Sequence, residues 1–306
     1  MRLIACTATH SLLVFAVPRH FTRRCVVQTL DLTNLRATRI PDLSALRQLQ
    51  KLTFRQNWLT SFSHIEGGCP HLTELDLYEN KIAKLSDCTF PPDLVTLDLS
   101  FNELKHMDGV AHLTRLRELY FVANRIKRIE GLEGLNKLRL LELGSNNLRS
   151  IDAAQLAHCP ALEELWLGRN KIEKIEGLEQ LPKLRKLSVQ SNRLTEIGDA
   201  LSQCTELREL YLSHNGLTGA PIGLSTLTRL TTLDLAGNRL TTLVGAGLES
   251  LTSLEELWLN DNQIATWADV EPVLRALADN LQTIYLELAR WAESATVKSW
   301  RRSACV

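Results

Sequence analysis

The 306-residue sequence contains no Gly-rich phosphate loop, no His-Glu-x-x-His motif and no nucleophile elbow, the short motifs that identify many nucleotide-binding, zinc-protease and serine-hydrolase sites. It also lacks any run of about 18 apolar residues, so we expect no membrane-spanning helix. The 35 basic and 35 acidic residues cancel, which is unlike the basic footprint of a nucleic-acid-binding protein. We therefore expect no enzymatic activity, no nucleic-acid or membrane partner and no cofactor.

Cysteine is scarce and scattered, with single residues at positions 6, 25, 69, 88, 159, 204 and 305. Cys69, Cys159 and Cys204 occupy a repeated position that other repeats fill with leucine, so they are predicted to be small core hydrophobes. His71 and His158 lie beside two of them and leave a metal site conceivable. Repeats are spaced about 5 Å apart, and Cys69 lies four repeats before Cys159. The two cysteines are therefore too distant to share a ligand sphere, and no metal is expected. The absence of a cysteine-rich cap favours a reducing compartment.

The sequence does contain a phrase, Leu-x-Leu-x-x-Asn, that returns every 22 to 24 residues between Leu75 and Asn262. This period with leucines at fixed offsets is the leucine-rich-repeat signature. The copies begin at Leu75, Leu97, Leu119, Leu141, Leu165, Leu187, Leu210, Leu233 and Leu257, with an outlying copy at Leu52 and weaker ones at Leu30 and Ile284.

Alternate residues of a strand point to opposite faces, so the leucines of each phrase enter the core and the middle residue points outward. The asparagine follows the strand, where its amide can satisfy backbone groups of the turn. A single strand and its return cannot bury their leucines alone, so neighbouring repeats must stack. The predicted fold is an α/β leucine-rich-repeat solenoid with a curved parallel sheet on the concave face and helical or irregular returns on the convex face.

The repeats define three segments. Residues 1–25 fit no repeat; we predict a poorly ordered tail or makeshift cap, and consider a secretory signal the weaker alternative because polar residues interrupt its apolar stretch. Residues 26–287 are predicted to form one elongated solenoid of about 11 to 12 repeats, with a helix over 267–277 for which Asp269 is a plausible N-cap. Residues 288–306 lack the turn asparagine and are interpreted as a divergent tail.

The middle residues of the phrases form a column on the outer side of the predicted sheet. Of the ten Tyr and Trp residues in the chain, five lie in this column, more than strand propensity alone would place there. Aligned exposed aromatics are typical of protein-binding surfaces. The column and its neighbour two residues earlier are rich in Asp and Glu, which favours a partner with basic and apolar patches, although solvated carboxylates on a sheet would look the same. The full column reads Asp31, Thr53, Asp76, Asp98, Tyr120, Glu142, Trp166, Ser188, Tyr211, Asp234, Trp258 and Tyr285.

The ordered phrases LDLYENKI (75–82), LDLSFN (97–102), LELGSN (141–146), QSNRLT (190–195) and LRELYLSHNG (207–216) resemble the leucine-rich-repeat regulatory subunit of type 1 protein phosphatase over roughly residues 50 to 287. The resemblance implies a non-catalytic protein, monomeric before partner binding, that holds the phosphatase catalytic subunit in its concave face and acts in the nucleus and cytoplasm. The matching positions are Asp98, Tyr120, Glu142, Trp166, Asp234, Glu256, Trp258 and Tyr285, and the aromatic column adds Tyr211.

The chain departs from this family in three respects. Tyr120 and Trp166 stand where phenylalanine is expected, and both ends differ from the acidic start and capped finish that the family usually has. The alternative hypothesis is a repeat scaffold of an axonemal, cytoskeletal or spliceosomal assembly that uses the same acidic groove.

Overall fold

The computed structural model describes residues 2–4, 27–63, 65 and 69–287. Its contacts group into two compact units, Met1–Leu167 and Gly168–Val306. Most of the N-terminal segment 1–25 and all of the divergent tail 288–306 lie outside the described residues, as do Cys6, Cys25 and Cys305. Within 1–25, Arg2–Ile4 form strand β1, which pairs in parallel with β2.

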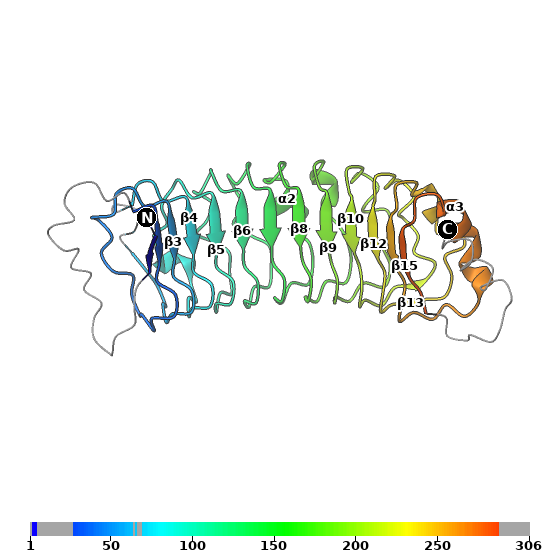
Figure 1. Ribbon diagram of the computed structural model, residues 1–306, viewed down its shortest axis with the longest axis horizontal. Helices are drawn as coiled ribbons and strands as arrows, with labels where there is room; N and C mark the ends of the chain where they lie inside the picture. Colours follow the sequence, from blue (N-terminus) through cyan, green and yellow to red (C-terminus); the bar gives the residue numbers. More distant parts are fainter. Residues whose placement is uncertain (1, 5–26, 64, 66–68, 288–306) are drawn as a thin grey trace. The chain divides into compact units, whose positions relative to one another are not determined.

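The first unit carries a parallel sheet whose strands lie side by side in chain order (Figure 1). Each strand has three residues, and each of those after β1 ends on the middle residue of its Leu-x-Leu phrase. The register advances by one full repeat at each step, so that Leu97 pairs with Leu119 and Leu119 with Leu141. After β1 the strands are β2 (Thr29–Asp31), β3 (Lys51–Thr53), β4 (Glu74–Asp76), β5 (Thr96–Asp98), β6 (Glu118–Tyr120), β7 (Leu140–Glu142) and β8 (Glu164–Trp166).

The second unit follows the same plan. Its main strands are β9 (Lys186–Ser188), β10 (Glu209–Tyr211), β12 (Thr232–Asp234), β14 (Glu256–Trp258) and β15 (Thr283–Tyr285), all parallel. Two short strands on the return side, β11 (Thr218–Gly219) and β13 (Arg239–Leu240), form a separate parallel pair. These strands extend the backbone hydrogen bonding of the turns into the returns.

The leucines of the phrases form the core of each unit, as predicted. Leu141 and Leu143 have no exposed surface, and they stack on the equivalent leucines of the adjacent repeats. Cys69, Cys159 and Cys204 are buried among them, which confirms their interpretation as core residues. Burial raises the pKa of the Cys159 thiol to about 12, so this sulfur remains protonated in the apolar stack.

The asparagine side chains form hydrogen bonds that link neighbouring turns. The side-chain amide of Asn146 donates to the carbonyls of Phe121 (2.8 Å), Leu143 (3.1 Å) and Gly144 (3.2 Å). Its Oδ1 accepts the N–H of Ile126 at 3.0 Å. A buried backbone group without such a partner would destabilise the fold, so the asparagine column is structural, as expected.

The returns are mostly irregular, with short helical turns at η2 (Leu85–Asp87), α2 (Ala153–Leu156), η3 (Leu178–Gln180) and η4 (Leu248–Ser250). These observations confirm the predicted solenoid class. The longer return in the second unit holds η5 (Trp267–Asp269) and α3 (Glu271–Leu277). No helix in the described ranges is long and apolar enough to cross a membrane.

The prediction that Asp269 is an N-cap is wrong. Asp269 is the last residue of η5, and its carboxylate accepts both the N–H and the hydroxyl of Thr266, at 3.1 and 2.6 Å. Thr266 is therefore the N-cap. Helix α3 begins at Glu271, two residues after Asp269. Pro272 lies in its first turn, where the missing N–H of proline costs no helical hydrogen bond.

Candidate partner-binding face

We define the sheet face of each unit as the outer surface of its sheet, made by the third residue of every strand and the residues two positions before and after it. In the first unit the register places Asp98, Tyr120, Glu142 and Trp166 on successive strands. In the second unit it places Tyr211, Asp234, Trp258 and Tyr285 in the same way, with Glu256 on the strand of Trp258. The nine predicted site residues thus form one row in each unit, and Glu256 flanks the second row.

A Glu-Leu-aromatic triplet recurs on four of these strands, and in three of them the aromatic side chain donates to the glutamate two residues earlier. The hydroxyl of Tyr120 lies 3.4 Å from Oε2 of Glu118. The indole N–H of Trp166 donates to Glu164 at 3.2 Å. Both side chains are half-buried, so these bonds orient the rings while leaving part of each ring open to solvent. The polar atoms that distinguish Tyr120 and Trp166 from phenylalanine are therefore already engaged within the chain.

The fourth triplet, Glu256-Leu257-Trp258, is held differently. The indole N–H of Trp258 is buried without a hydrogen-bond partner in the part of the chain that the structure describes. Its ring instead packs edge-on against Tyr285, with centroids 5.6 Å apart and planes at 80°, an arrangement that aromatic quadrupoles favour. Tyr285 is 54% exposed, which makes this pair the most open aromatic feature of the second sheet face.

The aspartates of the face have a structural role that the sequence analysis did not assign. Asp98 accepts the N–H of Ser100 at 2.9 Å, and Asp234 accepts the N–H of Ala236 at 3.0 Å. Each carboxylate thus closes the turn that follows its strand. Asp234 is only 4% exposed, so the prediction that the whole column is exposed is wrong at this residue. Ser188 is buried as well.

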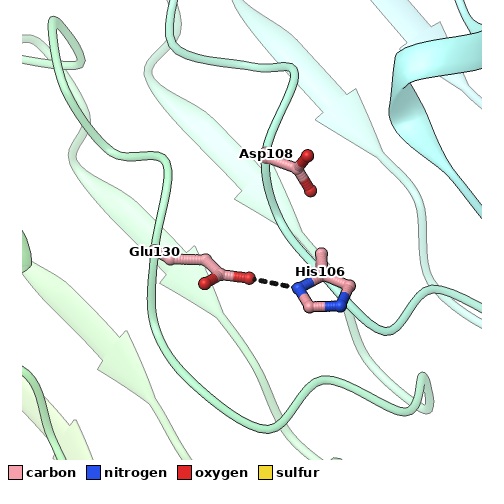
Figure 2. A group of neighbouring side chains, drawn as sticks. All are labelled: His106, Asp108 and Glu130. Atoms are coloured by element: carbon pink, nitrogen blue, oxygen red, sulfur yellow. Dashed lines mark hydrogen bonds and ion pairs between the residues drawn. The ribbon is translucent and has the colours of Figure 1, made fainter.

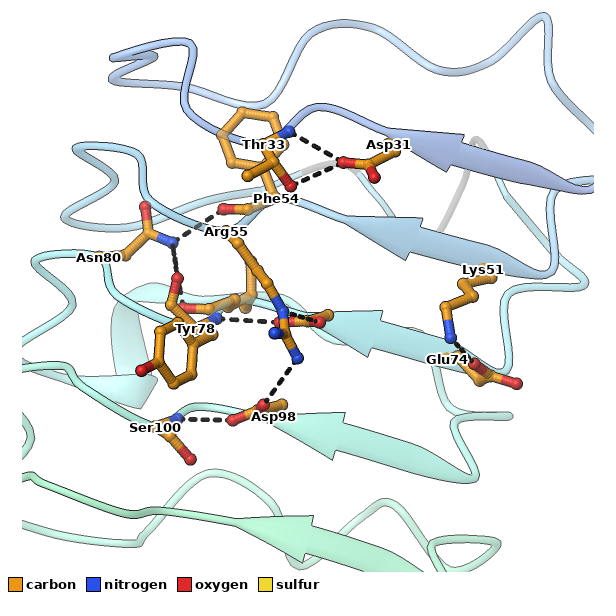
Figure 3. A network of polar contacts seen from close by, with 12 residues as sticks. Asp31, Thr33, Lys51, Phe54, Arg55, Glu74, Tyr78, Asn80, Asp98 and Ser100 are labelled. Atoms are coloured by element: carbon orange, nitrogen blue, oxygen red, sulfur yellow. Dashed lines mark hydrogen bonds and ion pairs between the residues drawn. The ribbon is translucent and has the colours of Figure 1, made fainter. Parts of the chain in front are cut away.

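Arg55 adds a positive charge to a sheet face that the sequence analysis described only as rich in Asp and Glu. Its guanidinium forms ion pairs with Asp76 and, at 3.7 Å, with Asp98, and it lies 5.0 Å from the ring centroid of Tyr78 (Figure 3). Position 55 is two residues beyond the middle residue Thr53, so an extended backbone carries it to the same face. Inspection of the residues two positions after the middle residue of each phrase would have revealed this positive charge.

Glu142, two strands beyond Asp98, has no ion-pair partner among the residues that the structure describes, whereas Asp98 has Arg55. Burial raises the pKa of Glu142, and the nearby Asp98 charge raises it further. Burial likewise raises the pKa of Asp98, against the lowering effect of its bonds from Ser100. For Tyr120, burial and then the Glu118 carboxylate raise the pKa to about 12. The centre of this face is therefore a partly desolvated negative patch that a basic group on a partner would stabilise.

The structure also brings together His106, Asp108 and Glu130 on the return side, a group not predicted from the sequence (Figure 2). Their potential ligand atoms lie within 4.8 Å of one another. Nδ1 of His106 is 2.7 Å from Oε1 of Glu130, and Arg128 approaches the other oxygen at 3.5 Å. Because these groups are solvent-accessible and two of them, His106 and Glu130, are paired with each other, they form a surface polar cluster of small energetic weight.

Comparison with protein families identifies the repeats. A family described as Leucine-rich repeat matches residues 69–171, one described as Leucine rich repeat matches 205–264, and one described as Leucine Rich repeats (2 copies) matches 47–88 and 182–221. Among curated proteins, a 57-residue segment is 42% identical to the Protein phosphatase 1 regulatory subunit SDS22 homolog of Caenorhabditis elegans. That match spans 19% of this chain and 18% of the relative, so it leaves most of both proteins uncompared.

Solved structures share the fold. A chain of the octameric complex of Latrophilin 3, Unc5D and FLRT2 (LRR) superposes with a TM-score of 0.77 at 23% identity, over 91% of this chain and 88% of that one. The functional domain of InlJ from Listeria monocytogenes has a TM-score of 0.64 at 26% identity, over 87% of this chain and 64% of that one. Repeat solenoids of this kind are typical of non-enzymatic proteins that bind other proteins.

Proposed function

Because this chain is a leucine-rich-repeat protein, we propose that its two sheet faces bind a protein partner and that this partner is the catalytic subunit of type 1 protein phosphatase. The chain would then be a non-catalytic regulatory subunit, monomeric before it binds. The observation that carries the proposal is the local similarity to the curated phosphatase regulatory subunit. The nucleus and cytoplasm are the compartments we propose for this activity.

The chemistry of the faces supports a basic, partly apolar partner. Glu142 and Asp98 are partly desolvated carboxylates on the strands on either side of Tyr120, with Arg55 beside Asp98, and Trp258 and Tyr285 offer open aromatic surface. Aromatic side chains that are already oriented lose little conformational entropy on binding, which favours them as anchors. A cationic side chain of the partner would relieve the repulsion between the two carboxylates.

An affinity purification from a native extract, followed by titration of the purified catalytic subunit, tests the proposal. We expect that subunit to be the leading partner and to bind with a dissociation constant that increases in Glu142→Gln and Trp258→Ala. Co-purification of axonemal, cytoskeletal or spliceosomal proteins, without a metallophosphatase, would favour the scaffold hypothesis instead. Lys127→Gln, an exposed substitution on the return side, provides the matched control.

A further inference from the structure

Trp58 is a large aromatic residue on the surface of the first unit, away from the row of predicted site residues. It follows Asn57 directly, at a position where the next repeats carry Lys81, Glu103 and Arg125. The side chain is 45% exposed. In the described part of this unit only Phe101, at 44%, is a comparably exposed large hydrophobic residue. The repeat architecture does not require tryptophan here, because the other repeats fill the position with polar residues or, at Gly216, with glycine.

Two cations lie close to the Trp58 ring. Nζ of Lys81 lies 5.2 Å from the ring centroid, and Cζ of Arg36 lies 5.9 Å from it. Within the described residues neither cation has an ion-pair partner. Both contacts are at cation–π distance, so the ring holds two positive charges at its partly exposed surface.

The ring also borders a hollow of about 360 Å³ formed by the turns of three consecutive repeats. The amides of Asn57 and Asn80, at its base, are occupied with backbone groups of the turns. Glu79 lines it too, and the Gln56 side-chain amide donates to that carboxylate at 2.9 Å. The hollow therefore combines an aromatic wall, the Lys81 cation and one carboxylate that is already hydrogen-bonded, and Arg36 lies against the same aromatic ring.

From this arrangement we propose that Trp58, Arg36 and Lys81 form a second docking site, for an acidic peptide segment that carries an apolar side chain. The apolar side chain would pack on the Trp58 ring, and carboxylates on either side of it would pair with Arg36 and Lys81. A protein segment fits better than a nucleic acid because the hollow offers one aromatic ring rather than a row of stacking platforms. The site is independent of the phosphatase partner proposed for the sheet faces.

Fluorescence anisotropy on the full chain tests this site with a labelled peptide of glutamates surrounding one phenylalanine. We expect Trp58→Ala and Lys81→Gln each to weaken binding about tenfold, as removal of a small-interface anchor does. Glu79→Gln should strengthen binding, because it removes the only carboxylate that lines the hollow. Phe101→Ala and Lys127→Gln, which alter an exposed aromatic and an exposed cation elsewhere in the unit, should leave the affinity unchanged.

Three outcomes would overturn the proposal: no binding of the acidic peptide to the wild-type chain, equal binding by wild type and Trp58→Ala, or capture of an oligothymidylate probe in preference to the peptide. Circular dichroism of each variant separates loss of binding from loss of fold. Titration of the phosphatase catalytic subunit against Trp58→Ala separates the two sites. Unchanged phosphatase affinity together with lost peptide binding supports a distinct site.

Discussion

The hydroxyl of Tyr211 donates a 2.9 Å hydrogen bond to Oε2 of Glu209, two residues earlier on the same strand. The same kind of hydrogen bond orients the side chains of Tyr120 and Trp166, whereas the ring of Trp258 packs against Tyr285. Burial and this bond raise the pKa of Tyr211, so its hydroxyl stays protonated and continues to donate to the Glu209 carboxylate. The sheet faces therefore present aromatic rings whose orientation is set before a partner arrives.

We expect Trp166→Ala and Trp258→Ala each to weaken association with the phosphatase catalytic subunit by about 2 kcal/mol, the loss typical of a buried aromatic anchor. The circular dichroism spectrum should remain unchanged. Tyr285→Ala should reduce the effect of Trp258→Ala in a double-mutant cycle, because the two rings support each other. Titration by calorimetry measures these losses, and equal affinities for all variants would contradict an aromatic docking face.

Glu142→Gln is expected to stabilise the fold while weakening binding. The raised pKa of Glu142 means that the native state holds a proton that the unfolded chain has released, in the pH window just above the ordinary value of 4.5. The free energy of unfolding therefore falls as pH rises through this window and stays lower at neutral pH. Glutamine removes this penalty. Urea unfolding at about pH 7 should show the gain in stability of the variant. This gain should shrink below about pH 4, where Glu142 of the wild type is mostly protonated in both the folded and the unfolded chain.

Asn146→Ala should destabilise the first unit by about 3 kcal/mol, because it leaves several buried backbone groups without partners. Asn136→Ala, an exposed position on a return, provides the control and should have little effect. Both are measured by chemical denaturation. Equal midpoints for the two variants would show that the asparagine column is not structural.

The buried thiols should react slowly. Burial raises the pKa of Cys159 to about 12 and that of Cys204 to about 11, so little thiolate exists near neutral pH, and neither sulfur is accessible. Burial raises the pKa of Cys88 to about 11 as well, but its side chain is half-exposed, so accessibility sets the order. Labelling with iodoacetamide, mapped by mass spectrometry, should modify Cys88 before Cys159 and Cys204. Similar rates at all three positions would indicate that the core opens readily.

Strand β15, the last one in the described part of the second unit, should be the least protected of its main strands. Ile284 is only partly buried, whereas Leu233 and Leu257, its equivalents in earlier strands, have no exposed surface. Amides of residues 284–287 should therefore exchange before those of β10 and β12, since local opening is easiest where neighbours are fewest. Hydrogen exchange with mass spectrometry resolves the order. Equal protection would mean that residues 288–306 cap the array.

The sequence alone determined the repeat period, the leucine core, the asparagine turns and the parallel register. Each of these follows from which residue recurs at which offset: Leu141 and Asn146 are buried because every neighbouring repeat supplies an equivalent residue. The aromatic row was predictable for the same reason, since alternation along a strand assigns Tyr120 and Trp258 to the outer face.

Only the tertiary structure decided what the side chains of that face do to one another. In the folded chain Asp234 is buried, Arg55 forms ion pairs with Asp76 and Asp98, and the Lys81 ammonium lies near the Trp58 ring. Periodicity assigns a residue to a face but does not specify how far a long side chain reaches or which neighbour it meets. Burial and pairing depend on the packing of several repeats at once, so the charge that each face offers a partner emerges only when the repeats are stacked.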